Sequence, residues 1–192
     1  MPEPLALEQL SDKDLVEQAK TSQAAFKVLV DRHWRRLYAF VKRLYFFEHE
    51  EVQDILQEAF IKIYRNLNAF DASFAFSTWA YQITRNCAID ALRKKRVQPQ
   101  AFTLEDDEWE RLLVATDDTV KGSLHLEEVK HAIARLPLAH REAFTLFYLE
   151  EKTYEEMIDI LKKPKGTIAS LINRAKLMVR KQLEYSAAIS SL

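Results

Sequence analysis

The residues best suited to binding chemistry lie between positions 68 and 96, where an aromatic loop leads into a basic helix. Phe74 and Phe76 stand in the loop, and the helix ends in four consecutive basic residues, Arg93 to Arg96. Aromatic rings stack on unpaired bases, at about 1–3 kcal/mol per base, and basic side chains follow phosphates. The adjoining features favour a single-stranded nucleic acid as ligand. Simpler alternatives stay open: Trp79 can be a core residue, and the basic run can be a solvated helix end that stabilises its own dipole.

A second candidate site lies near the C-terminal end. Thr153-Tyr-Glu-Glu156 predicts a capping box, in which the Thr153 hydroxyl accepts from the Glu156 amide and the Glu156 carboxylate accepts in return. The pattern then predicts a short helix over 154–161, a turn over 162–166 and a longer helix from Thr167 to about Glu184, which is a helix-turn-helix. Residues 162–181 carry seven basic side chains and no acid. This charge favours DNA over a plain helical bundle.

Composition and charge indicate how these sites are organised. Two glycines in 192 residues, with much Leu, Ala, Glu and Lys, predict an all-α protein of two small helical domains. The net charge is only −1, yet residues 101–120 hold seven acids against Arg111 alone. We therefore expect domains at 1–96 and 123–192, joined by a flexible acidic linker at 97–122. The acidic linker can lie in a positively charged channel as a mimic of nucleic acid, or it can be a solvated tether.

The first domain is expected to contain four helical segments. Residues 1–10 read as a loose leader, and Ser11 is positioned to cap the next helix. Apolar residues from Phe26 to Tyr45 and from Val52 to Leu67 recur at helical spacing and predict an antiparallel hairpin with a turn at 46–49. In the second of these helices one face is apolar, formed by Val52, Ile55, Leu56, Ala59, Phe60, Ile63, Tyr64 and Leu67. The opposite face carries Asp54, Gln57, Glu58 and Arg65, with Ile61 among them, which is either a chance exposed residue or the centre of a docking patch. Ser77 is the expected cap of the last helix, which should run to about Lys95. On that helix we expect Phe76, Trp79, Ala80, Ile83 and Cys87 to face inward, and Thr78, Tyr81, Gln82, Arg85, Ile89 and Arg93 to project outward or sideways.

Several classes of function lack support in the sequence. There is no glycine-rich phosphate loop, no nucleophile–base constellation and no metal-ligand spacing, so neither an enzyme, a cofactor nor a small-molecule substrate is expected. The single Cys87 excludes an internal disulfide. No apolar run is long enough to span a bilayer and no signal peptide is visible, so we expect a cytosolic protein without a membrane-inserted segment.

Three segments together resemble bacterial sigma factors. Asp54-Ile-Leu-Gln-Glu-Ala-Phe-Ile-Lys-Ile-Tyr-Arg-Asn-Leu67, continuing to Phe70, resembles their core-polymerase-binding segment. Residues 74–96 resemble the segment that melts promoters and reads the minus-ten element, and residues 136–175 resemble the domain that reads the minus-thirty-five element. The pattern is similar to the small extracytoplasmic-function (ECF) type, which keeps only the second and fourth sigma domains.

The resemblance implies an alternative sigma factor, which is a non-catalytic subunit that directs transcription initiation. Its implied partners are core RNA polymerase, through the β′ clamp helices and the β flap, together with promoter DNA and an anti-sigma factor. The implied polymerase contacts are Asp54, Gln57, Glu58 and Ile61. The implied minus-ten contacts are Asp71, Ser73, Phe74, Phe76, Trp79, Arg85, Asn86, Arg93 and Lys94. The implied minus-thirty-five contacts are Arg141, Lys165, Thr167, Ser170, Asn173 and Arg174.

The chain departs from the family pattern at a few positions. Lys162 stands where the helix-turn-helix turn usually has glycine, and a left-handed lysine there would cost about 1 kcal/mol. Ala169 and Leu171 replace basic residues, so base reading can lean on thymine methyl groups. Gln82 and Ile83 replace the tryptophan pair with which primary sigma factors melt DNA, which fits a stringent alternative factor. The competing hypothesis is a stand-alone helix-turn-helix regulator with an unrelated N-terminal domain.

Overall fold

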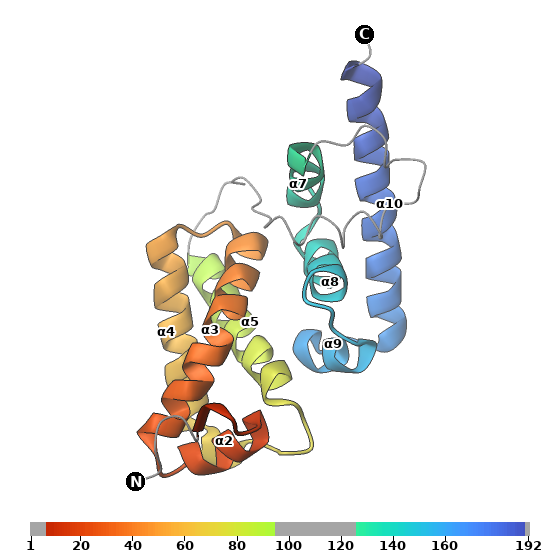
Figure 1. Ribbon diagram of the computed structural model, residues 1–192. Helices are drawn as coiled ribbons and strands as arrows, with labels where there is room; N and C mark the ends of the chain where they lie inside the picture. Colours follow the sequence, from red (N-terminus) through yellow and green to blue (C-terminus); the bar gives the residue numbers. More distant parts are fainter. Residues whose placement is uncertain (1–6, 95–125, 191–192) are drawn as a thin grey trace. The chain divides into compact units, whose positions relative to one another are not determined.

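The computed structural model describes residues 7–94 and 126–190, and the regular elements in these ranges are all helices (Figure 1). The chain divides into two compact units, one formed by residues 1–42 and 47–96 and the other by residues 43–46 and 97–192. The predicted all-α class is therefore confirmed. The expected linker at 97–122 lies entirely outside the described residues.

In the described residues, the main elements of the first unit are α-helices and one short 3-10 turn. These are α2 (Asp12–Ala19), α3 (Gln23–Tyr45), α4 (His49–Arg65), η1 (Leu67–Ala69) and α5 (Phe76–Lys94). Ser11 caps α2 as predicted, because its hydroxyl accepts from the Asp14 amide at 3.2 Å. At the start of α4, the Glu51 carboxylate accepts from the Glu48 amide at 2.8 Å. Helices α2 and α4 thus both begin where a side chain satisfies a free backbone amide.

Aromatic contacts join α3 to α4 and α5. Phe60 of α4 stacks on Trp34 of α3, with ring centroids 5.9 Å apart, and meets Phe26 edge-on at 6.4 Å. Phe40 of α3 packs against Tyr81 of α5 at 4.9 Å. The predicted pairing of α3 with α4 is confirmed, and α5 packs along α4 to complete the bundle (Figure 1).

Helix α5 differs from the sequence-based expectation in two ways. It begins at Phe76, so Ser77 lies in its first turn and does not cap it. Thr78 and Tyr81, expected outside, are only 3% and 2% exposed, while Trp79 is half-buried. The reason is that α5 contacts α4 on one side and α2 and α3 on others, so that more than a single stripe is buried.

The N-terminal segment also differs from the expected loose leader. Leu7 is 3% exposed, and the carbonyls of Glu8 and Leu10 accept hydrogen bonds from the Arg32 guanidinium at 3.1 Å. Residues 7–10 are therefore held on the first unit by α3. Residues 1–6, the rest of the predicted leader, lie outside the described residues.

The second unit contains α7 (Leu126–Ala134), α8 (Leu138–Tyr148), α9 (Tyr154–Leu161) and α10 (Lys165–Ser190). Its core includes Ile133, Leu136, Phe144, Val179 and Leu183, each at most 3% exposed. Helix α10 packs against α7, α8 and α9, and therefore holds the unit together (Figure 1).

The helix-turn-helix forms largely as the sequence predicts. The Thr153 hydroxyl accepts from the Glu156 amide at 3.2 Å, and the Glu156 carboxylate accepts from the Thr153 amide at 2.9 Å. Lys162 ends α9 with φ 52° and ψ 47°, which is the left-handed conformation expected for this position. Helix α10 starts at Lys165, two residues before the predicted start, because the Pro164 carbonyl already accepts from the Thr167 and Ile168 amides.

Candidate protein and nucleic-acid interfaces

The outer face of α4 presents the four predicted polymerase contacts together. Asp54, Gln57, Glu58 and Ile61 are all exposed, and their spacing of three, four and seven residues places them on one side of the helix. Ile61 is 43% exposed although its side chain is large and apolar. A row of two carboxylates, an amide and an aliphatic side chain is suited to binding another protein.

The two carboxylates of this face are not equivalent. Glu58 forms an ion pair with Lys62 at 2.7 Å, and this hydrogen bond lowers the pKa of Glu58. The Lys62 ammonium also lies 3.4 Å from the sulfur of Cys87 on α5. Within the described part of the chain, Asp54 forms no ion pair. Asp54 therefore offers an unneutralised negative charge to a partner, whereas Glu58 shares its charge with Lys62.

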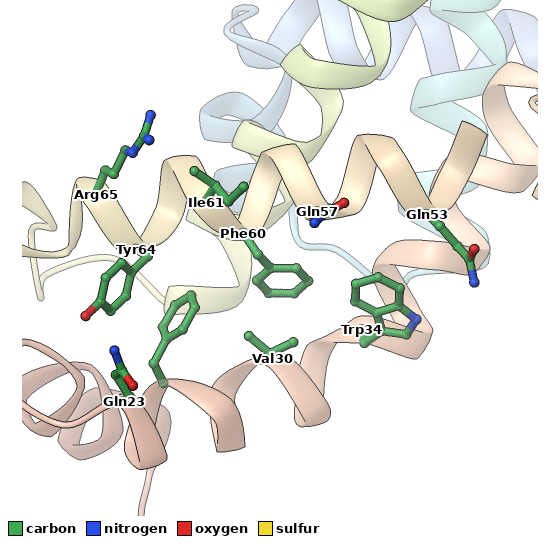
Figure 2. A pocket seen from close by; sticks show the side chains of 10 residues that line it. Gln23, Val30, Trp34, Gln53, Gln57, Phe60, Ile61, Tyr64 and Arg65 are labelled. Atoms are coloured by element: carbon green, nitrogen blue, oxygen red, sulfur yellow. The ribbon is translucent and has the colours of Figure 1, made fainter. Parts of the chain in front are cut away.

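An apolar groove of about 820 Å³ runs beside this face, between α3 and α4 (Figure 2). Phe60 extends from α4 toward Val30 and Trp34 on α3, Tyr64 extends toward Gln23, and Ile61 lies at the α4 edge. The full lining is Gln23, Phe26, Val30, Trp34, Gln53, Gln57, Phe60, Ile61, Tyr64 and Arg65.

The groove corrects one expectation and adds residues that the sequence analysis missed. Tyr64 was expected in the buried stripe of α4, but it is 41% exposed. Its ring lies 4.8 Å from that of the half-buried Phe26, so the two rings meet at the surface. The available signal was the spacing of Phe26, Val30 and Trp34 on α3 opposite Phe60 and Tyr64 on α4. Apolar side chains with a rim of amides are typical of a protein-docking surface.

The loop between η1 and α5 presents a different chemistry. Asp71, Ser73 and Phe74 are exposed, and Phe74 is 47% exposed. The Asp71 carboxylate accepts a hydrogen bond from the Ser73 amide at 2.9 Å, and this bond lowers the pKa of Asp71. The backbone carbonyl of Asp71 accepts a second hydrogen bond, from the Phe74 amide at 3.1 Å. This turn directs the Phe74 ring into solvent, where it can stack on a base.

Phe76, which the resemblance implied as a minus-ten contact, does not share that exposure and faces inward, as its place on the helix predicted. It is 3% exposed and packs against Phe70 and Trp79, with each pair of ring centroids 6.1 Å apart. Phe70 and Trp79 are 5.0 Å apart. The three rings form an aromatic floor beneath the loop, and only the half-buried Phe70 and Trp79 retain a partly open surface.

The remaining predicted minus-ten contacts lie further along α5. Asn86, Arg93 and Lys94 are exposed and Arg85 is half-buried. Arg93 forms an exposed ion pair with Asp90 at 3.3 Å, which adds little to stability and leaves the guanidinium available to a phosphate. Lys95 and Arg96, the end of the basic run, lie outside the described residues.

The second unit exposes one polar face of α10. The side chains of Lys165, Thr167, Ser170, Asn173 and Arg174 are all exposed at the N-terminal half of this helix, while Ile168 and Ile172 between them are buried. An exposed amide, a hydroxyl and a guanidinium on one helix face match the donors and acceptors of base edges.

Two of the predicted residues of this unit, Lys165 and Arg141, already have partners within it. Lys165 pairs with Glu155 at 3.1 Å and lies 5.6 Å above the Tyr154 ring. Arg141 donates to the Ala134 carbonyl at 2.7 Å, so part of its guanidinium ties α8 to the end of α7.

Metal and membrane roles receive no support from the described residues. In the ranges 7–94 and 126–190, no group of His, Cys, Asp or Glu could hold a metal ion. None of the helices described here is both long and apolar enough to cross a membrane.

Comparison with known protein families matches both units. Residues 29–97 match the family model of Sigma-70 region 2, and residues 126–179 match that of Sigma-70, region 4. The chain is 32% identical over 185 residues to the ECF RNA polymerase sigma factor SigW of Bacillus subtilis strain 168, covering 92% of this chain and 98% of the relative. It is 34% identical over 178 residues to the ECF RNA polymerase sigma-E factor of Escherichia coli K12, covering 88% of this chain and 92% of the relative.

Solved structures show a similar fold. CnrH, determined in complex with the cytosolic domain of CnrY, superposes with a TM-score of 0.67 at 23% identity, covering 91% of this chain and 97% of CnrH. The sigma factor RpoE of Bartonella quintana, determined with the anti-sigma factor NepR, gives a TM-score of 0.64 at 23% identity, covering 83% and 96%.

Proposed function

This chain belongs to the ECF family of RNA polymerase sigma factors, and from that premise we propose which of its surfaces bind core polymerase and which bind promoter DNA. It is an alternative sigma factor that binds core RNA polymerase and directs promoter recognition, DNA melting and transcription initiation. We assign residues 1–96 to the polymerase- and minus-ten-binding domain, residues 123–192 to the minus-thirty-five-binding domain, and residues 97–122 to the acidic linker.

The outer face of α4 and the adjoining groove form the proposed docking surface for the β′ clamp helices. Asp54, Gln57 and Glu58 supply polar contacts, and Ile61 with the groove supplies apolar area that a helix can cover. The observation that carries this assignment is that Gln57 and Ile61 belong both to the polar row and to the groove wall. One helix of the partner could therefore contact both surfaces at once.

The loop 71–75 and α5 form the proposed minus-ten surface. Flipping a base out of the duplex costs a few kcal/mol, which stacking on an exposed ring such as Phe74 offsets. Asp71 and Ser73 shape the loop, and Arg85, Asn86, Arg93 and Lys94 would hold the neighbouring strand. Phe76 supports this loop from below, and Trp79 contributes to its floor.

The exposed face of α10 forms the proposed minus-thirty-five surface. Ser170, Asn173 and Arg174 would reach base edges or phosphates in the major groove, with Lys165 and Thr167 at the helix start. Lys165 would exchange its contact with Glu155 for a phosphate, because that exposed pair is weak. Arg141 would add a backbone contact.

Three broader proposals follow from membership of the family. The protein acts in the cytoplasm, where core polymerase and promoter DNA are found, and has no catalytic activity of its own. An anti-sigma factor would inhibit it by covering the polymerase- and DNA-binding surfaces. RpoE of Bartonella quintana, which has a similar fold, has been crystallised with the anti-sigma factor NepR.

Charge reversal on α4 tests the polymerase assignment. Asp54→Lys combined with Glu58→Lys should abolish binding to core polymerase, measured by fluorescence anisotropy of the labelled protein, and should abolish promoter-specific transcription in vitro. Glu17→Lys is the matched control, since Glu17 is an exposed acid of α2 that pairs only locally with Lys20. Unchanged core binding by the double variant would contradict the assignment and would favour a helix-turn-helix regulator that works without polymerase.

A further inference from the structure

His33 is a nearly buried imidazole in the first unit that the proposed surfaces do not use. It lies on α3, is 8% exposed, and its Nε2 is 2.7 Å from a carboxylate oxygen of Asp12 at the start of α2. The His33 ring also packs against the Phe76 ring, with the two ring centroids 5.1 Å apart. One side chain thus connects the first turn of α2 to the first residue of α5.

The Asp12 end of this connection is firmly held. Its second carboxylate oxygen accepts from Arg32 at 2.5 Å, and the same guanidinium holds the carbonyls of Glu8 and Leu10. The hydrogen bond from His33 is the largest of the effects that lower the pKa of Asp12. Residues 8–12 and α3 therefore form one fixed support, against which the His33 ring is oriented.

The Phe76 end determines the shape of the loop that precedes it. Phe76 is the residue at which the chain leaves the loop and enters α5, and it is part of the aromatic floor with Phe70 and Trp79. A movement of the Phe76 ring would displace both the end of the loop and the floor under it. A pocket for an unpaired base has to be preformed, because ordering a mobile loop on binding reduces affinity.

We infer that α2 braces the base-binding loop through Asp12, His33 and Phe76, and that His33 is a positioning residue for promoter opening. The inference rests on the proposed function of the loop 71–75. It assigns a role to α2, a helix outside the polymerase, minus-ten and minus-thirty-five surfaces. The brace positions only the loop that binds the unpaired strand, so the affinity for core polymerase should not depend on it.

Two substitutions at His33 separate its two contacts. His33→Gln keeps a group that can hydrogen-bond to Asp12 but removes the ring that touches Phe76. His33→Phe keeps a ring against Phe76 but loses the bond to Asp12, which remains paired with Arg32. His49→Gln is the matched control, because His49 makes a similar pair of contacts, a 2.7 Å hydrogen bond and a ring contact with Tyr38, far along α4 from the loop.

The assay measures the affinity of the holoenzyme for a single-stranded oligonucleotide. The oligonucleotide carries the non-template minus-ten strand of a promoter recovered by the wild-type holoenzyme from random DNA. We expect His33→Gln to weaken this affinity at least 5-fold, His33→Phe to recover most of the loss, and His49→Gln to match the wild type. Core-polymerase affinity should stay within 2-fold for all three. Asp12→Asn, which preserves side-chain shape, should weaken the affinity for the oligonucleotide 2- to 3-fold. This variant replaces His33→Gln as the test if His33→Gln does not fold.

The outcomes distinguish the brace from the loop assignment. Equal losses of core affinity and oligonucleotide affinity would show a general structural defect and overturn the brace. Wild-type affinity in His33→Gln, or in Asp12→Asn when the first does not fold, would also overturn it. If the wild-type holoenzyme transcribes but does not bind the unpaired strand, the loop assignment itself fails, and the brace fails with it.

Discussion

Replacing Lys162 by glycine should stabilise the second unit relative to replacing it by alanine. Lys162 adopts the left-handed conformation, and its amide donates to the Ile158 carbonyl at 2.8 Å. Any residue with a Cβ atom is strained there by about 1–2 kcal/mol, and glycine is not. Glycine also has more conformational freedom in the unfolded chain, and this entropy destabilises the folded state by about 0.4–1 kcal/mol relative to alanine. The difference leaves Lys162→Gly about 1 kcal/mol more stable than Lys162→Ala.

The comparison with alanine isolates the backbone from the side chain. Both variants lose the same ammonium group, whose ion pair with Asp159 is long at 3.9 Å and largely exposed. In a unit of this size, 1 kcal/mol corresponds to a shift of about 4–8 °C in Tm. Thermal unfolding followed by circular dichroism, together with hydrogen exchange of the α9 and α10 amides, would measure the change where it occurs.

Lys163 provides the matched control next in the chain. Its φ is not positive, so glycine there relieves no strain and only gains freedom in the unfolded chain. Lys163→Gly should therefore be less stable than Lys163→Ala by about 0.4–1 kcal/mol. The order of stability of the two variants should reverse between positions 162 and 163. The same order at both positions would refute the argument from backbone strain.

Three further predictions concern other features of the two units. Thr153→Ala should destabilise the second unit by about 1 kcal/mol in a urea titration, because it removes the hydroxyl that caps α9, while Thr153→Ser should retain most of the stability. Asp12 has a lowered pKa in the folded protein, so its contribution to stability is present above its ordinary value of 3.8 and is lost as the pH falls through the lowered pKa. Asp12→Asn should thus be destabilising in denaturant titrations at pH 7, and its deficit relative to the wild type should shrink below pH 3.8. Phe74→Ala should change the free energy of unfolding by less than about 0.5 kcal/mol, since the ring is half exposed, yet should weaken holoenzyme binding to the unpaired minus-ten strand by about 5-fold or more. A Phe74→Ala holoenzyme that binds this strand normally would remove the ring from the proposed site.

The sequence predicted features that depend on neighbours close in the chain. The Ser11 cap, the Thr153–Glu156 capping box and the left-handed Lys162 are local, because each involves residues within a few positions of one another. The exposure of the polar row on α4 followed from the period of a single helix. Each of these needed no knowledge of which helices become neighbours.

The predictions that were wrong concern residues whose burial depends on contacts between different helices. Tyr81 was placed outside because a helix packed on one side buries a single stripe, whereas α5 is also covered by Phe40 from α3. Tyr64 was placed inside because it falls in the apolar stripe of α4, but its contact with Phe26 of α3 leaves it 41% exposed. The His33 contact with Asp12 spans 21 residues, and no local pattern signals it. Packing between helices decides such positions, and one sequence does not state it.

The burial of Cys87 makes this protein convenient to study with attached fluorophores. The chain has a single cysteine, which is 1% exposed, and burial raises the pKa of its thiol. Little thiolate is therefore available to a maleimide at neutral pH. A cysteine introduced at an exposed site, such as Glu17→Cys, should react first, and a dye there could follow holoenzyme assembly molecule by molecule in an otherwise native chain.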